Sequence, residues 1–224
     1  MSRSGVIARS FVGVMVLALP IFVAAGRWDF WNGWRYVALA VVGTALTHAL
    51  ARGDADLTVD RAARAREGEA WDRRLLGAIF GSTVVMYVVA GLDAGRFGWS
   101  GPVAWWVPVV GATVMLSGQL LFAIARRENA FFSSTVRLQE DRGHEVCDRG
   151  VYRRVRHPGY TGMLLSILAF PFVLGSYWSL GAALCTAALL VVRTWKEDRF
   201  LMERLTGYRA YAERTRWRLV PGVL

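Results

Sequence analysis

The residues best suited to chemistry lie between Arg126 and Leu224, and most of them precede one apolar segment. The run from Gly150 to Gly162 reads Gly-Val-Tyr-Arg-Arg-Val-Arg-His-Pro-Gly-Tyr-Thr-Gly. Because proline is favoured in the first turn of a helix, we predict that His157 lies near a helix N-cap. Free backbone N–H groups and the helix dipole can receive an anion there. A cluster of Arg, His and Tyr at this position therefore fits a ligand that carries a carboxylate.

The three arginines of this run also have a simpler explanation. Arg153, Arg154 and Arg156 can anchor the loop to anionic lipid head groups without any part in catalysis. That explanation does not account for His157 or Tyr160. Both interpretations of the arginines therefore stay open from the sequence alone.

A second group of ionisable residues follows the next apolar segment, where Arg193 and Glu197 are four residues apart. Residues at this spacing share one face of a helix, here in the partly dehydrated zone at the edge of a membrane. One possibility is a structural salt bridge between the two side chains. The other is that both point into a pocket shared with His157 and Tyr160, since a helical hairpin returns its two ends to the same membrane face.

Long apolar segments indicate how these residues are positioned. About 20 apolar residues cross the ~30 Å hydrocarbon core of a bilayer. Segments near this length predict four spans at 6–25, 34–50, 75–92 and 103–125, and a helical hairpin at 158–196 that is interrupted by Pro171 and by a turn at 175–179. The predicted fold is all-α, a polytopic integral membrane protein with about five or six transmembrane helices and a C-terminal helical hairpin.

The first 125 residues form an N-terminal region of four spans. The first span has an alternative interpretation as a secretory signal, because Ala24-Ala25-Gly26 is an acceptable cleavage site. The second span follows within ten residues and favours a membrane helix. Residues 51–74 mix arginines with acidic residues, and we interpret this cytosolic linker as a charged helix at the membrane surface without a catalytic role. Residues 126–224 form the second region, which carries the candidate chemistry.

Composition excludes several classes of protein. Of the 224 residues 54% are hydrophobic, yet the formal net charge is +10. A disordered basic tail would lack the apolar residues, and a nucleic-acid module would rarely carry long uncharged runs. Cys147 and Cys185 are far apart and predict no disulfide framework. His48, His144 and His157 are too scattered for a metal site, so we predict no metal.

Basic residues indicate the orientation in the membrane. Of the 27 Lys and Arg, only Arg27, Arg35 and Arg96 lie on one side of the predicted membrane, which leaves 24 on the other. By the positive-inside rule the second side is cytosolic and holds both termini. The basic residues are 26 Arg and one Lys, and Ala, Gly and Val abound. This bias indicates a GC-rich genome, so we expect the inner membrane of a bacterium.

Several short motifs occur in a specific order over residues 129–224. They are Arg142 to His144, Gly150 to Tyr152, Arg156 to Gly162, the acidic pair Glu197-Asp198, and Tyr208, Tyr211 and Pro221. In this order the sequence resembles the isoprenylcysteine carboxyl methyltransferase family, with the related phospholipid N-methyltransferases behind it. Two positions depart from the family pattern: Val151 stands where proline is common, and Asp198 replaces the second of two glutamates.

The resemblance implies a binding site for S-adenosylmethionine (SAM), built from a cytosolic loop and the last two spans. No GxGxxG turn is present, so a Rossmann-type domain is not available for the cofactor. The implied cofactor-binding residues are Gln139, His144, Glu145, Val146, Cys147, Tyr152, His157, Pro158, Gly159, Tyr160 and Glu197. The resemblance places Arg193 toward the acceptor substrate.

These implications predict a membrane-embedded SAM-dependent methyltransferase, of EC 2.1.1 type, that O-methylates a lipophilic, isoprenoid-like acid. An amine acceptor is the first alternative, but an amine must lose a proton and would be repelled by Arg193. A non-catalytic scaffold or transport protein is the second, with His48 in a membrane span as its best support. The expected partners are a lipophilic substrate that enters from the bilayer, and membrane lipids; we expect neither nucleic acid nor an obligate protein partner.

Overall fold

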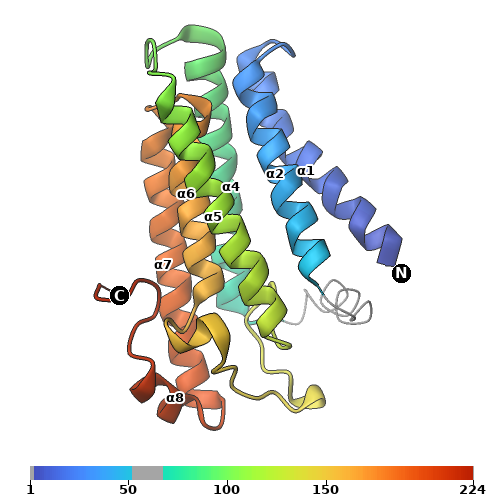
Figure 1. The fold of residues 1–224 in the computed structure, drawn as a ribbon, viewed down its shortest axis with the longest axis vertical. Coiled ribbons are helices and arrows are strands. Elements are labelled where there is room, and N and C mark those ends of the chain that lie inside the picture. The colour runs from blue at the N-terminus through green and yellow to red at the C-terminus, as the bar shows by residue number, and fades with distance from the viewer. Residues whose placement is uncertain (1–2, 52–67, 224) are drawn as a thin grey trace.

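The computed structural model describes residues 3–51 and 68–223, and within these ranges the chain is helical and contains no strand (Figure 1). Its α-helices are α1 (Arg3–Ala25), α2 (Trp31–Leu50), α4 (Ala70–Ala90), α5 (Trp106–Glu128), α6 (Pro158–Leu174), α7 (Ser179–Arg204) and α8 (Tyr208–Arg214). Three shorter helical segments are η2 (Gly91–Phe97), which is π-helical, and the 3₁₀ turns η3 (Glu140–Arg142) and η4 (Gly150–Arg153). The predicted all-α class is confirmed.

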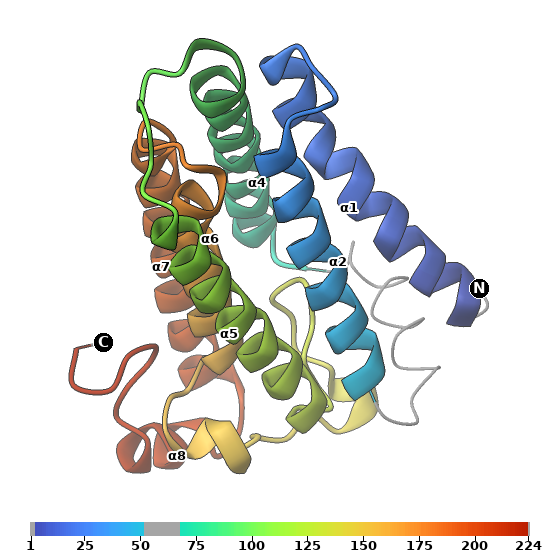
Figure 2. The same ribbon diagram turned by 45° about the horizontal axis from the view of Figure 1, so that its top comes forward.

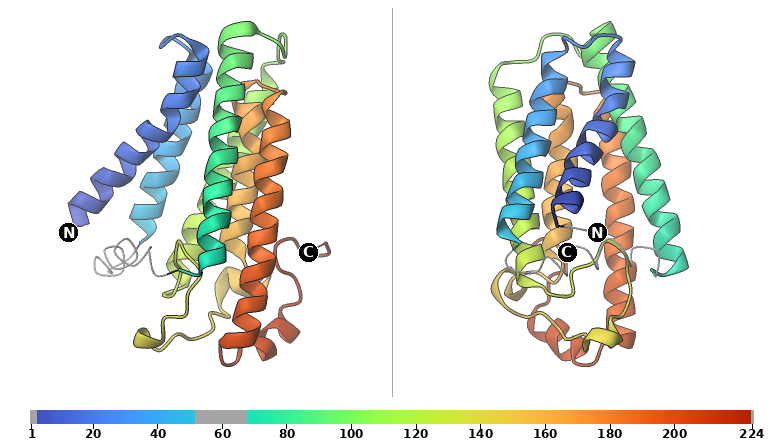
Figure 3. Two further views of the ribbon diagram at one scale, coloured as in Figure 1. Left: turned by 180° about the vertical axis from the view of Figure 1, so that it is seen from behind. Right: turned by 90° about the vertical axis from the view of Figure 1, so that its right-hand side faces the viewer.

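The longer helices, α1, α2 and α4 to α7, run along the long axis of the molecule (Figure 1, Figure 3). Among the described helices, three are long and apolar enough to cross a membrane: Ser4–Ala25, Ala70–Phe97 and Trp106–Glu128. Helix α6 is apolar but shorter. The fold is therefore that of an integral membrane protein, and the total of five or six spans stays a prediction.

The C-terminal hairpin forms as predicted, with a turn at 175–178 between α6 and α7. Pro171 does not interrupt α6, because the helix continues through it to Leu174. Helix α4 begins at Ala70, earlier than the predicted third span. The end of the charged linker therefore belongs to α4, and residues 52–67, where we predicted a surface helix, lie outside the described residues.

Glycines allow α5 and α6 to pack closely. A Cβ atom added at Gly162 would collide with the backbone carbonyl of Gly118, and one added at Gly118 would collide with the carbonyl of Gly162. Small residues at such crossings let two membrane helices approach until their backbones touch. This contact fixes the start of α6 relative to α5.

The two ends of the bundle differ in character. At one end, the buried carboxylate of Asp93 in η2 accepts hydrogen bonds from the Ser100 backbone (2.7 Å) and the Ser176 hydroxyl (2.7 Å), which ties two turns together. Exposed tryptophans lie in the loops and helix ends there, as in an interfacial aromatic belt: Trp28, Trp31, Trp34, Trp99, Trp105, Trp106 and Trp178. The opposite end carries α8, the loop between α5 and α6, and the C-terminal tail (Figure 1).

Helices α1 and α2 separate from the other helices toward the end of the bundle that carries α8 (Figure 3). Near η2 they pack against the bundle, where Ile21, Phe22 and Ala25 are buried in the core. Toward the start of α1 the pair diverges from α4 to α7 (Figure 2, Figure 3).

Candidate active site

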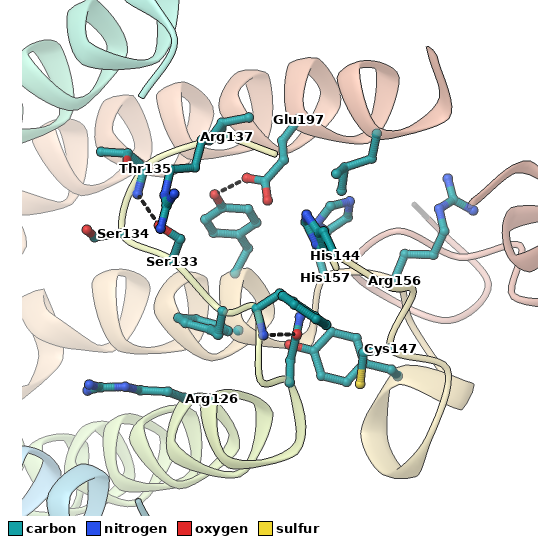
Figure 4. A pocket seen from close by; sticks show the side chains of 18 of the residues that line it. Arg126, Ser133, Ser134, Thr135, Arg137, His144, Cys147, Arg156, His157 and Glu197 are labelled. Carbon is teal, nitrogen blue, oxygen red and sulfur yellow. Dashed lines mark hydrogen bonds between the residues drawn. The ribbon is translucent and has the colours of Figure 1, made fainter. Parts of the chain in front are cut away.

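A cavity of about 520 Å³ lies at the end of the bundle that carries α8 (Figure 4). Its walls come from every long helix, from α8 and from the loop between α5 and α6. Ten of the twelve residues that we predicted for the site line it: His144, Glu145, Val146, Cys147, Tyr152, His157, Gly159, Tyr160, Arg193 and Glu197. The other two, Gln139 and Pro158, do not line this cavity.

His157 is the N-cap residue of α6, as predicted, and Pro158 occupies the first helical position. No side chain caps this helix, so backbone N–H groups of its first turn remain for other acceptors. The ring of Phe132 packs directly against Gly159, where a Cβ atom would come within 2.7 Å of it. Glycine at this position therefore brings the loop against the helix start.

A buried carboxylate, Asp198, organises the groups behind His157. It accepts hydrogen bonds from the guanidinium of Arg156 (2.7 and 2.8 Å), from Arg218 (2.8 Å) and from the Tyr208 hydroxyl (2.9 Å), and the His157 Nε2 lies 3.1 Å away. We call this set the Asp198 cluster. Burial alone would raise the pKa of the carboxyl, but the hydrogen bonds from His157, Arg156 and Arg218 outweigh it and hold that pKa well below its usual range.

The Asp198 cluster decides between the two explanations of the arginines. Arg156 is 5% exposed and also donates to the carbonyls of Thr215 and Arg216 (both 2.8 Å). It is therefore a structural ion-pair residue, and a lipid-anchoring role for Arg156 is wrong. Arg153 and Arg154 are exposed, so that role remains open for them.

The C-terminal tail closes over the start of α6. The backbone N–H groups of Arg156 and His157 donate to the carbonyls of Trp217 and Arg218 (both 2.9 Å). The Thr161 hydroxyl donates to the carbonyl of Leu219 (2.8 Å). These contacts hold the backbone at and before His157 and the side chain of Thr161 after it, so the tail positions the N-cap residue.

Tyr160, Arg193 and Glu197 meet in the cavity. The Tyr160 hydroxyl donates a hydrogen bond to Glu197, and the Arg193 guanidinium carbon lies 5.2 Å from the centre of the Tyr160 ring. The structural salt bridge between Arg193 and Glu197, one of the two possibilities from the sequence, is not formed in the described part of the chain. Arg193 pairs instead with Asp72 of α4, with Nε–Oδ1 and Nη2–Oδ2 distances of 2.7 and 3.2 Å.

The loop between α5 and α6 folds around Gln139 and His144. Gln139 is buried, donates to the carbonyl of Phe131 (2.6 Å) and accepts a hydrogen bond from Arg142, so it holds the loop together behind the cavity. The His144 ring packs on the Phe131 ring, with 4.6 Å between the ring centres. Burial, followed by the charges of Arg137 and Arg142, lowers the pKa of His144 to about 4. The imidazole is therefore neutral at pH 7.

Glu128 fixes the short turn that carries Tyr152. Its carboxylate accepts the Val151 backbone N–H (2.8 Å), and it lies where a Cβ atom at Gly150 would be. Gly150 also has φ = +53°, in the left-handed region that favours glycine. The Tyr152 hydroxyl donates to the carbonyl of Ala125 (3.2 Å), and burial raises its pKa.

Two charged residues of the site were not assigned from the sequence: Arg126, which lines the cavity, and Asp72, which pairs with the cavity residue Arg193. Arg126 lines the cavity from the last turn of α5 (Figure 4), and no other group in the described part of the chain hydrogen-bonds to it or pairs with it. A desolvated cation without a protein partner favours an anionic ligand. The sequence could have indicated Arg126 only by its place at the boundary between the fourth predicted span and the basic loop. Many arginines at such boundaries contact only lipid.

Known proteins match the part of the chain that builds this cavity. Residues 109–203 match the model of the isoprenylcysteine carboxyl methyltransferase (ICMT) family. A probable protein-S-isoprenylcysteine O-methyltransferase of Oryza sativa subsp. japonica is 30% identical over 89 residues, which is 34% of this chain and 47% of the relative. Protein-S-isoprenylcysteine O-methyltransferase B of Arabidopsis thaliana is 28% identical over 107 residues, 45% of this chain and 47% of the relative.

A relative from Xenopus laevis is also a protein-S-isoprenylcysteine O-methyltransferase. It is 30% identical over 103 residues, 45% of this chain and 32% of the relative. The chain thus spans about half of the curated relatives it matches, or less. The matched residues 109–203 contain most of α5, the loop with η3 and η4, α6 and nearly all of α7. The resemblance seen in the motifs is confirmed: the C-terminal region of the chain is similar to the isoprenylcysteine carboxyl methyltransferase family.

Proposed function

We propose that this protein is a membrane-embedded methyltransferase that uses SAM to methylate the carboxylate of a lipophilic, isoprenoid-like acid. One observation carries the proposal. A single cavity, lined largely by the family-matched residues 109–203, gathers an uncapped helix N-terminus, the Glu197 carboxylate and two arginines, Arg126 and Arg193. A volume of about 520 Å³ is within the usual range for small-molecule sites.

The cavity offers groups that match the charges of SAM. The amino-acid part of SAM has a carboxylate, which suits the backbone N–H groups of Gly159 and Tyr160 in the first turn of α6. Its amino and sulfonium groups are cationic and suit Glu197, whose carboxylate is oriented by Tyr160. Aromatic side chains such as Phe131 and Tyr152 line the same cavity and can pack on a purine. When bound, SAM supplies an electrophilic methyl group.

The arginines fit an acid as the methyl acceptor. Four arginines and two glutamates line the cavity, and two of these arginines, Arg156 and Arg193, have acidic partners in the protein. Arg126 has none in the described residues, so it and the free edge of Arg193 can hold the acceptor carboxylate. A carboxylate is ionised and nucleophilic at pH 7, so the site needs no general base.

The protein contributes alignment and exclusion of water. Methyl transfer is an in-line displacement, so the acceptor oxygen must be held opposite the sulfur. The tail that covers the start of α6 and the loop against Gly159 enclose this region. In such an enclosed site the fixed charges act more strongly than in water.

The lining also supports entry of the acceptor from the bilayer. Beside the polar residues it includes apolar side chains of the membrane helices, among them Val6 of α1, Leu76 of α4 and Met163 of α6. These side chains suit an isoprenoid-like chain whose acid group reaches the arginines. His48 of α2 lines the same cavity, so it belongs to this site and gives no separate support for a transport function.

Labelling with methyl-labelled SAM tests the proposal. The purified protein in lipid nanodiscs is incubated with a bacterial lipid extract, and the product is treated with base. Methyl esters release volatile methanol, whereas N-methyl groups do not, so base-labile label supports the proposal. Base-stable label would establish an amine acceptor instead, and no label would favour a scaffold. Mass spectrometry of the labelled product then identifies the acceptor.

The cellular location is part of the same proposal. The described ends of the chain lie in the half of the molecule that holds the cavity (Figure 1). The basic residues favour the cytosolic side for this half, where SAM is available. We therefore place the protein in the inner membrane of a bacterium, with both termini cytoplasmic.

A further inference from the structure

A buried carboxylate from the N-terminal half of the chain pairs with an arginine of the cavity wall. Asp72 lies in the first turn of α4 and is fully buried. Its two oxygens accept hydrogen bonds from Nε and Nη2 of Arg193, at 2.7 and 3.2 Å. The two residues are 121 positions apart, and Asp72 lies outside the family-matched residues 109–203.

The contacts of Arg193 leave one edge of its guanidinium for a ligand. Nε and Nη2 are held by Asp72, and Nη2 also donates to the carbonyl of Ser134 (2.9 Å). One face of the group lies over the Tyr160 ring. In the described residues Nη1 has no acceptor. The protein therefore fixes the plane of the guanidinium and keeps Nη1 available.

Asp72 also holds a part of the cavity wall. Its Oδ2 accepts the backbone N–H of Val136 (2.8 Å), and the Glu69 N–H donates to the Val136 carbonyl (3.0 Å). Gly68 is pressed against Thr135, where a Cβ atom would lie 2.6 Å from the threonine Cβ. The start of α4 thus secures the loop segment that contacts Arg193.

Without Asp72, Arg193 has a competing partner. Glu197 is one helical turn away on the same face of α7 and lines the same cavity. Residues at this spacing readily form an ion pair. In that pair the guanidinium would turn away from the acceptor, while the Tyr160 hydroxyl still holds the Glu197 carboxylate in place. Asp72 therefore keeps Arg193 available to the acceptor.

We propose that Asp72 is a positioning residue that orients Arg193 toward the acceptor carboxylate, and that the N-terminal helices complete the active site in this way. This inference rests on the proposed methyl transfer. It predicts that loss of the Asp72 charge weakens recognition of the acceptor anion and leaves the binding of SAM nearly unchanged.

The first test compares Asp72→Asn with the wild type in steady-state methylation. We expect kcat/KM for the acceptor to fall about tenfold or more, with the SAM dissociation constant within about twofold of wild type. Asp148→Asn is the matched control, because Asp148 also pairs with an arginine (Arg214, 3.1 Å) but is exposed and does not line the cavity. An equal loss of SAM affinity in Asp72→Asn would overturn the proposal.

A double-mutant cycle separates positioning from a structural role. If Asp72 acts through Arg193, Asp72→Asn causes no further loss of kcat/KM when Arg193→Gln is already present. The double variant also controls for misfolding. Asp72→Asn alone leaves the charge of Arg193 buried without its partner, whereas the double variant removes both charges. A similar loss in both backgrounds would contradict the positioning role. Asp72→Glu, which keeps the charge, should restore part of the activity.

A binding measurement tests Asp72 even if methyl transfer is not observed. Tryptophan fluorescence of the protein in nanodiscs follows binding of a C15 isoprenoid acid and of the corresponding neutral alcohol. We expect the wild type to prefer the acid and Asp72→Asn to lose that preference. Absence of methyl transfer with this pattern would reject the proposed function alone. An unchanged preference for the acid in Asp72→Asn would reject the role of Asp72.

Discussion

Adjacent residues on α7 serve different parts of the site. Arg193 and Glu197 face the cavity, whereas Asp198, the next residue, turns to Arg156, His157 and the C-terminal tail. A step of one residue rotates the side chain by about 100° around a helix. The acidic pair therefore divides its functions: the first carboxylate is available to a ligand, and the second holds the protein around it.

Arg126 gives a direct test of the acceptor charge. Because it lines the cavity without a partner among the described residues, Arg126→Gln should raise the acceptor KM about tenfold, which corresponds to ~1.4 kcal/mol, and leave SAM binding unchanged. Steady-state kinetics with both substrates varied measures this split. The neighbouring exposed Arg127→Gln is the control. Equal effects of the two substitutions would show that Arg126 acts only through general surface charge.

Asp198 should matter for stability over a defined pH range. Asp198→Asn leaves Arg156 buried without its carboxylate, which we expect to cost about 3–5 kcal/mol of unfolding free energy near pH 7. The folded-state pKa of Asp198 lies below the unfolded value of ~3.9, so the carboxylate stabilises the fold above that pH and loses this effect as pH falls toward the folded pKa.

The measurement is the difference in thermal unfolding between wild type and Asp198→Asn in the same detergent. It should stay constant from about pH 8 to pH 5 and shrink only below about pH 4. A difference that already changes between about pH 8 and pH 5 would mean that the charge of Asp198 does not control the cluster.

At the scale of elements, α5 and α6 form the frame on which the cavity is built. Their contact at Gly118 and Gly162 sets the height of the α6 N-terminus relative to the last turn of α5. That turn carries Arg126, and the N-terminus carries His157. A small displacement between the helices would therefore separate the two ends of the proposed site.

A glycine substitution tests this frame. Gly162→Ala places a methyl group against the backbone of Gly118 and should destabilise the protein by about 1–3 kcal/mol, with a fall in turnover. Gly181→Ala on α7 is the control, because that glycine has no atoms within 4 Å of an added Cβ and should be neutral or stabilising by up to ~1 kcal/mol. Thermal unfolding in nanodiscs compares the two. Equal stability would mean that the helices adjust without strain.

For the molecule as a whole, local sequence patterns predicted the helices. They did not predict which side chains far apart in the sequence form ion pairs. The helices follow from apolar length, and the N-cap at His157 follows from the proline after it. The meeting of Tyr160 with Glu197 follows from the return of a hairpin to one membrane face. Nothing local links Asp72 to Arg193, because the pair depends on how α4 packs beside α7. A charged linker residue therefore looked like a surface residue.

The orientation of the whole molecule in the membrane is the last prediction. After Cys147 and Cys185 are replaced by serine, single cysteines are introduced at the exposed positions Trp99, Arg153 and Glu213. Trp99 lies among the aromatic residues at one end, and the other two lie beside the cavity end. A membrane-impermeant maleimide applied to cells with a permeabilised outer membrane should label only Trp99→Cys. Arg153→Cys and Glu213→Cys should react only after the inner membrane is opened, since the basic end faces the cytosol. The reverse pattern would place the cavity outside the cytosol, away from its proposed cofactor.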